Sequence, residues 1–192
     1  MEKILVLDNY DSFTYNLVHY VKETGTHEVT VVRNDVIDLD DVDAFDGIIL
    51  SPGPGIPEEA GLLLPLIERY YATKRIFGVC LGLQAIVLVF GGKLVNMKQV
   101  YHGVATDVDV IQPPHYLFEG MPEQIQTGRY HSWMADQECF PLELRIDAKD
   151  HEGQIMAASH RVYDVCGVQF HPESILTPPG RQMIRNWLGT DG

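Results

Sequence analysis

The chain has 192 residues, of which 45% are hydrophobic and 21% charged, a composition that favours a folded globular protein. Its net charge of −13 and its isoelectric point near 4.8 argue against binding to nucleic acid or to anionic membrane surfaces. Three cysteines are too few and too scattered for a disulfide framework or a zinc site, so we expect a reducing, cytoplasmic setting.

No targeting or membrane-spanning segment is expected. Residues 1–8 contain a short apolar run followed by acid, which is unlike a signal peptide. The longest uninterrupted apolar run, residues 85–90, is far too short to cross a bilayer. Because no linker-like stretch or internal repeat interrupts the chain, residues 1–192 are predicted to form one domain.

The first ninety residues alternate between strand-like and helix-like segments. Apolar, β-prone runs predict strands at 4–7, 29–32, 48–50 and 75–77. Helices are predicted at 13–22, 62–71 and 83–90. This alternation is typical of an open, mostly parallel twisted α/β sheet with helices on both faces, as in a flavodoxin-like core.

After Gly91-Gly92 the pattern changes to short strand-like pieces separated by turns. These pieces lie at 93–95, 105–111, 144–148, 155–159 and 165–170, and a last helix is predicted at about 180–188. Such pieces favour antiparallel pairing, so we expect a small antiparallel sheet added at one edge.

The segment Gly78-Val79-Cys80-Leu81-Gly82 lies where a predicted strand turns into a helix. It has the spacing of a nucleophile elbow, G-x-S-x-G, with cysteine in place of serine. A nucleophile at so sharp a turn is strained, and side chains at the flanking glycines would crowd the neighbouring strand and helix. The free N–H groups of the helix start favour a thiolate. The alternative is a buried structural cysteine between two unrelated glycines.

Two other stretches follow predicted strands and are expected at the same edge of the sheet as Cys80. In Ser51-Pro52-Gly53-Pro54-Gly55, a rigid backbone N–H could pair with that of Leu81 as an oxyanion hole, although a plain tight turn is the alternative. In the second stretch, His171 and Glu173 share a side if the backbone stays extended through Pro172. An imidazole held by a carboxylate can form the thiolate and protonate a departing amine.

The other histidines and cysteines have weaker support. His131, in Arg129-Tyr130-His131-Ser132-Trp133, is a second candidate base, although its neighbours are more typical of substrate contacts. Cys139 and Cys166 have no helix start or histidine beside them, so both are predicted to be inert.

Together, these segments resemble the class I (triad) glutamine amidotransferases. Within that family the chain is similar to the small subunits of anthranilate synthase and aminodeoxychorismate synthase. The resemblance covers nearly the whole chain and depends on residues 7–17, 33–35, 51–55, 59–61, 78–82, 84–85, 90–92, 102–103, 129–132 and 167–176. Leu83, Val104 and Trp133 depart from the residues usual in the family.

The resemblance implies a catalytic triad of Cys80, His171 and Glu173, with the Gly53 and Leu81 amides as the oxyanion hole. Glutamine would be held by Gly53, Pro54, Gly55, Gln84, Ser132 and Trp133. The enzyme would hydrolyse glutamine through a Cys80 thioester and deliver ammonia to a chorismate-converting partner subunit that makes anthranilate. No cofactor is expected in this chain, whereas chorismate and magnesium are expected in the partner.

Three alternatives stay open at this point. The partner could belong to aminodeoxychorismate synthase, or one chain could serve both synthases. A cysteine α/β hydrolase would share the elbow, but its acid would precede its histidine, whereas Glu173 follows His171. A non-catalytic α/β binding or regulatory module is the last alternative, and it leaves the His171-Pro172-Glu173 motif unexplained.

Overall fold

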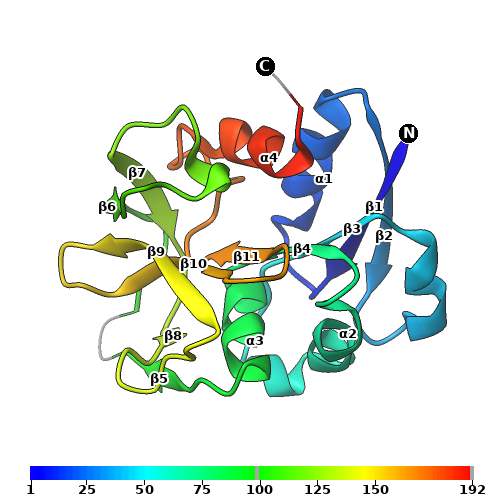
Figure 1. Ribbon diagram of the computed structural model, residues 1–192, viewed down its shortest axis with the longest axis horizontal. Helices are drawn as coiled ribbons and strands as arrows, with labels where there is room; N and C mark the ends of the chain where they lie inside the picture. The colour runs from blue at the N-terminus through cyan, green and yellow to red at the C-terminus, as the bar shows by residue number, and fades with distance from the viewer. Residues whose placement is uncertain (98–99, 191–192) are drawn as a thin grey trace.

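A computed structural model describes residues 1–97 and 100–190, in which a large twisted sheet is flanked by helices (Figure 1). The strand order of this sheet is β2-β1-β3-β4-β11-β10-β9-β6-β7. Its parallel part comprises β1 (Glu2–Asp8), β2 (His27–Arg33), β3 (Gly47–Leu50), β4 (Arg75–Val79) and β11 (Val165–Val168). Its antiparallel part comprises β10 (Ile155–His160), β9 (Leu144–Asp150), β6 (Val104–Val110) and β7 (Gln124–Arg129). β5 (Leu94–Asn96) and β8 (Trp133–Ala135) form a separate antiparallel pair.

Helices cover both faces of the parallel part. α1 (Thr14–Glu23) and α4 (Gly180–Leu188) lie on one face, and α2 (Leu63–Tyr70) and α3 (Leu81–Val89) lie on the other (Figure 1). Side chains alternate along β1 accordingly, since Ile4 and Val6 pack in the core below α1 and α4, whereas Leu5 and Leu7 pack in the core beside α2 and α3. Short 3₁₀ helices occur at Leu39–Ala44, Pro57–Glu59 and Tyr116–Phe118.

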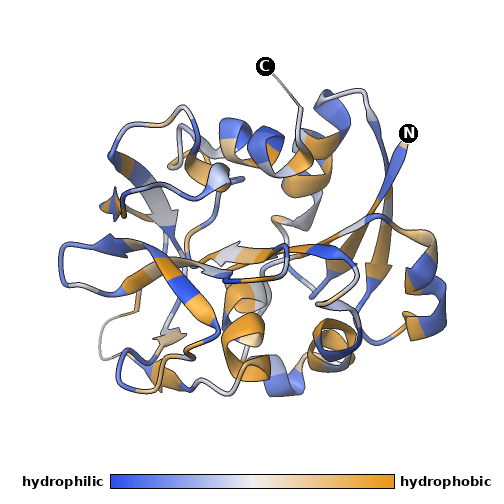
Figure 2. Cartoon of the chain, viewed as in Figure 1, coloured by the Kyte–Doolittle hydropathy of each residue, from blue (hydrophilic) through white to orange (hydrophobic). Residues whose placement is uncertain are grey.

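α3 differs from the other helices because it is apolar on nearly its whole circumference (Figure 2). Residues 81–87 are all buried, since α3 contacts α2, β8 and the sheet strands β4 and β11. A helix that is hydrophobic all round is stable only when neighbours enclose it. The helix that follows Cys80 is therefore held rigidly in the core.

The predicted fold class is confirmed, and the elements of the parallel half match closely. The antiparallel part is larger than expected, because four of its strands continue the main sheet. The sequence patterns did not predict β7 and β8. Several predicted bounds differ by two residues, and two of them bear on the site: α3 begins at Leu81 rather than at residue 83, and β11 ends at Val168 rather than at residue 170.

Candidate active site

Cys80 lies at a sharp strand-to-helix turn, between the end of β4 and the start of α3. Its backbone has φ 51° and ψ −99°, a strained conformation for a residue other than glycine. A Cβ atom at Gly78 would lie 2.5 Å from the Gly82 carbonyl carbon, and one at Gly82 would lie 2.7 Å from the Leu50 carbonyl oxygen. The two glycines therefore allow the close backbone approach that the turn requires, and the side chain of Cys80 is left 5% exposed.

The backbone of Cys80 is tied to the strand that leads to His171. The Cys80 N–H donates to the Val168 carbonyl at 2.8 Å, and the His171 N–H donates to the Gly128 carbonyl at 2.9 Å. The imidazole Nδ1 lies 2.7 Å from a carboxylate oxygen of Glu173, and both side chains are buried. The rings of Tyr130 and Phe13 flank the imidazole, with centroids 4.8 Å and 5.6 Å away.

The expected geometry of the His171–Glu173 pair was wrong, although the two side chains do meet. The backbone does not stay extended through Pro172, because β11 ends at Val168 and residues 172–173 lie in a turn. The Ser174 N–H closes this turn by donating to the His171 carbonyl at 3.2 Å. The turn, rather than strand alternation, folds the carboxylate back onto the ring.

The electrostatics of His171 favour the imidazolium. Burial lowers the pKa of His171, but the neighbouring Cys80 thiol and the Glu173 carboxylate together outweigh burial and raise the pKa to about 10. Within the described residues, the Nε2 atom makes no hydrogen bond of good geometry. Cys80 and His171 line the same cavity without a formed hydrogen bond between them, as is common in active sites before substrate aligns the reacting groups.

The loop at 51–55 is fixed against the elbow by buried amides. The Asn9 N–H and side-chain amide donate to the hydroxyl and the carbonyl of Ser51, both at 2.8 Å. Asn34 in turn donates to Asn9 at 3.0 Å. A Cβ atom at Gly53 would lie 2.7 Å from atoms of both Asn9 and Leu81, so only glycine fits there. In the described part of the chain, the backbone N–H groups of Gly53 and Leu81 donate no hydrogen bond to another protein group.

A cavity of about 200 Å³ opens beside the sulfur. It brings together Cys80 and the residues expected to hold glutamine, which are Gly53, Pro54, Gly55, Gln84, Ser132 and Trp133. A second cavity, of about 540 Å³, reaches from Cys80 and His171 to the 10–13 segment. The roles of these residues stay predictions, but the geometry places them around one sulfur atom.

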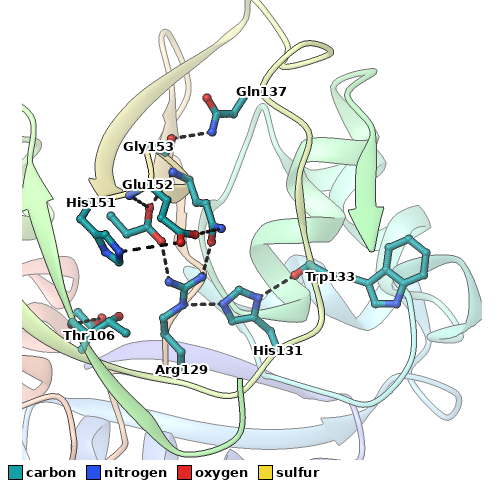
Figure 3. A network of polar contacts seen from close by, with 11 residues as sticks. Thr106, Arg129, His131, Trp133, Gln137, His151, Glu152 and Gly153 are labelled. Carbon is teal, nitrogen blue, oxygen red and sulfur yellow. Dashed lines mark hydrogen bonds and ion pairs between the residues drawn. The ribbon is translucent and has the colours of Figure 1, made fainter. Parts of the chain in front are cut away.

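The environment of His131 is unsuited to a general base. Its Nε2 accepts from Arg129 Nε–H at 3.0 Å, and its Nδ1–H donates to the Trp133 carbonyl at 2.9 Å (Figure 3). Burial, with a further contribution from the Arg129 charge, lowers the pKa of His131 to about 3. Both ring nitrogens are therefore occupied in a neutral ring, and His131 holds the backbone at Trp133.

Several residues at the site were missed by sequence reasoning. Gln169 Nε2 lies 3.5 Å from the Cys80 sulfur, and Phe13 and Tyr130 pack against His171. Arg129 is fully buried, and it pairs with Asp150 at 2.7 Å. Gln169 and Arg129 both lie in segments that carry the family resemblance, but no sequence pattern predicted a role for either residue.

The departures from the family pattern fall outside the reacting groups. Leu83 is a core residue, and Val104 is exposed on β6. Trp133 contributes its backbone carbonyl to the site, while its indole points away from the Arg129 network (Figure 3).

Cys166, predicted to be inert, lies buried in β11. Burial raises the pKa of Cys166 well above its usual range, so this thiol stays protonated.

The described residues contain neither a metal cluster nor a membrane-spanning helix. No group of three or more His, Cys, Asp or Glu side chains there could hold a metal ion. No helix among the same residues is long and apolar enough to cross a membrane.

Comparison with known proteins decides the family. The model of the family described as glutamine amidotransferase class-I matches residues 5–189. The chain belongs to the class-I glutamine amidotransferases. Membership in this enzyme family decides against the cysteine hydrolase alternative and against a non-catalytic module.

Among curated amidotransferase relatives, aminodeoxychorismate/anthranilate synthase component 2 of Bacillus subtilis is 43% identical, covering 97% of this chain and 96% of the relative. Anthranilate synthase component 2 of Pseudomonas aeruginosa is 42% identical, covering 98% of this chain and 96% of the relative. Aminodeoxychorismate synthase component 2 of Escherichia coli is 42% identical, covering 96% and 98%. A crystal structure from Thermoplasma acidophilum, described as that of a GMP synthase subunit, superimposes with a TM-score of 0.87 at 29% identity, covering 98% and 93%.

Proposed function

We propose that this amidotransferase hydrolyses glutamine at Cys80 and supplies the ammonia to a larger, chorismate-converting synthase subunit. The observation that carries the proposal is the meeting of three groups: a cysteine on a strained elbow, an imidazole that lines the same cavity, and a carboxylate 2.7 Å from that imidazole. This is the arrangement of a nucleophile, its base and the group that orients the base.

In the first half of the reaction, the Cys80 thiolate attacks the carboxamide carbon of glutamine. The Gly53 and Leu81 amides stabilise the resulting oxyanion, and removal of one such donor typically costs on the order of 100- to 1000-fold in rate. His171 gives the proton on Nε2 to the leaving nitrogen, the C–N bond breaks, and ammonia departs. A glutamyl thioester on Cys80 is left.

In the second half, His171 takes a proton from water, and the hydroxide attacks the thioester carbon. The C–S bond breaks, glutamate leaves, and the thiolate and imidazolium are restored. Glu173 holds the ring through Nδ1 in both halves and stabilises its positive charge. Gln84, Ser132, Trp133 and the loop at 53–55 line the cavity beside the sulfur and would hold glutamine there.

For the partner, we favour anthranilate synthase, with a chain shared by both synthases as the second candidate. Relatives named for either synthase are about equally similar to this chain, and the Bacillus subtilis relative carries both names. Chorismate and magnesium are assigned to the partner, and no step described above uses the metal. We also propose that residues 1–192 form one amidotransferase domain in the cytoplasm, where the three free thiols would stay reduced.

The test replaces the nucleophile in the complex with the synthase subunit. Cys80→Ser should abolish product formation from glutamine while sparing product formation from added ammonium salt. Mass spectrometry of the product formed from chorismate then distinguishes anthranilate from aminodeoxychorismate. Glutamine-dependent product at the wild-type rate in Cys80→Ser would contradict the assignment.

A further inference from the structure

A buried side-chain amide lies against the reacting sulfur, on a residue that the reaction scheme above does not use. Gln169 follows β11 directly and is 1% exposed. Its Nε2 atom lies 3.5 Å from the Cys80 sulfur, within hydrogen-bond range for a sulfur acceptor. A carboxamide can present either N–H or oxygen, so its effect on a thiolate depends on which end faces the sulfur.

The neighbouring hydrogen bonds decide the orientation of this amide. The Trp133 carbonyl can only accept, so Gln84 presents an N–H to it at 2.8 Å. The same Gln84 nitrogen donates its other N–H to the Gln169 oxygen at 3.2 Å. The oxygen of Gln169 is thereby engaged on the side away from Cys80. Its N–H group is left facing the sulfur.

The far end of this network is anchored by buried charge. Arg129 pairs with Asp150 at 2.7 Å and donates Nε–H to His131, which leaves the Nδ1–H of His131 for the Trp133 carbonyl (Figure 3). Arg129 has only donors, so the imidazole tautomer follows from its position. Arg129 therefore fixes which nitrogen of His131 donates to the Trp133 carbonyl. The same carbonyl accepts from Gln84 and orients its amide.

We propose that Gln169 is a catalytic residue, whose N–H donates to the Cys80 thiolate, lowers the cost of its burial and holds the sulfur toward glutamine. The inference rests on the proposed function, because it takes Cys80 to be the nucleophile. A thiolate accepts a hydrogen bond more strongly than a thioester sulfur does. The amide therefore stabilises the sulfur before attack and again when the thioester breaks and the thiolate leaves.

The test measures the thiolate directly, by the rate of iodoacetamide labelling of Cys80 at a series of pH values, followed by peptide mass spectrometry. Gln169→Met keeps the length of the side chain and removes the donor, and we expect its labelling midpoint to rise by about one pH unit. Gln169→Glu keeps an acceptor for Gln84 but turns a carboxylate oxygen to the sulfur, so its midpoint should rise further. In the complex, kcat/KM for glutamine should fall by about tenfold in Gln169→Met, with the ammonium-dependent rate unchanged.

Gln182→Met, the same substitution at an exposed position on α4, is the matched control and should leave the labelling midpoint at the wild-type pH. A packing role for Gln169 predicts lower thermal stability without a shift of the midpoint. Wild-type midpoints in both Gln169 variants would therefore overturn the inference. If Gln169→Met fails to fold, Gln169→Glu decides, because it retains the bond with Gln84. Failure of the proposed function is seen separately, as glutamine-dependent product in Cys80→Ser.

Discussion

Replacement of Glu173 by glutamine separates the charge of the carboxylate from its hydrogen bond. The amide oxygen of Gln can still accept from His171 Nδ1–H, but it carries no charge. The pKa of His171 is about 10 against an ordinary 6.5, a difference that corresponds to about 5 kcal/mol in favour of the imidazolium. Cys80 and Glu173 both contribute and burial opposes them, so an equal division of the net difference assigns the carboxylate at least about 2.4 kcal/mol, or roughly 50-fold in the protonation equilibrium.

The assay for Glu173→Gln is glutamine hydrolysis by the complex with its synthase subunit, measured as kcat/KM against pH. We expect the alkaline limb of kcat/KM, where His171 loses its proton, to move to lower pH by about two units, so the loss of kcat/KM should grow with pH toward roughly 50-fold above pH 10. Ammonium-dependent product formation should not change, and Glu138→Gln, at an exposed loop position, is the matched control. An alkaline limb at the wild-type pH would refute the argument that this carboxylate holds the imidazolium.

Three further outcomes are expected. Gly82→Ala places a Cβ atom 2.7 Å from a backbone oxygen and should lower the free energy of unfolding, measured in urea, by about 3 kcal/mol. Gly25→Ala, at φ 68° with open space around it, should lower it by about 1 kcal/mol. Equal losses in the two variants would contradict the close-packing argument. The pKa of His131 is about 3 in the folded protein and 6.5 in the unfolded chain. Its contribution to stability is therefore present above pH 6.5 and is lost as the pH falls toward 3. By pH 4.5 this loss is about 3 kcal/mol, and urea unfolding of His131→Gln at pH 7 and 4.5 should show a pH dependence smaller by that amount. Glutaminase turnover should rise when the synthase subunit is added, and equal turnover with and without it would argue against coupling.

The parallel half of the fold could be predicted because its strands are continuous apolar runs buried on both faces. Ile4 to Leu7 in β1 and Ile48 to Leu50 in β3 are all fully buried. β7 was missed because two of the three side chains on its inward side are polar. Thr127 and Arg129 are fully buried in β7, beside one buried apolar side chain, Ile125. The Arg129 charge is paired with Asp150 of β9, which lies two strands away in the sheet. With two of its three inward side chains polar, β7 lacks the apolar alternation from which a buried strand is inferred, whereas β9 was predicted from its apolar residues at 144–148.

The candidate site shows a related difference between residue identity and geometry. His171 and Glu173 were predicted as a pair from strand alternation, yet a turn brings them together. Gln169 was overlooked because its role depends on Gln84 and Trp133, which lie far from it in the sequence. Local patterns fix which residues carry chemistry, but the orientation of an amide is set by partners that only the folded chain brings close.

Polar groups on the two sides of the sulfur are satisfied to different degrees, and the difference follows the reaction. On the side of the cavity lined by Gln84 and Trp133, both N–H groups of Gln84, both ring nitrogens of His131 and the Trp133 carbonyl have partners. On the other side, His171 Nε2 and Glu173 Oε2 are buried without a partner among the residues described here. Leaving a buried polar atom unpaired costs about 1–3 kcal/mol, so the fold tolerates this cost beside the nucleophile. In the proposed reaction Nε2 gives a proton to the leaving nitrogen and then accepts one from water, and a fixed hydrogen bond to another protein group would have to break in each step. In that scheme the unpaired Nε2 is the atom whose proton moves, the unpaired Oε2 of Glu173 moves none, and the paired atoms are those that have to hold still.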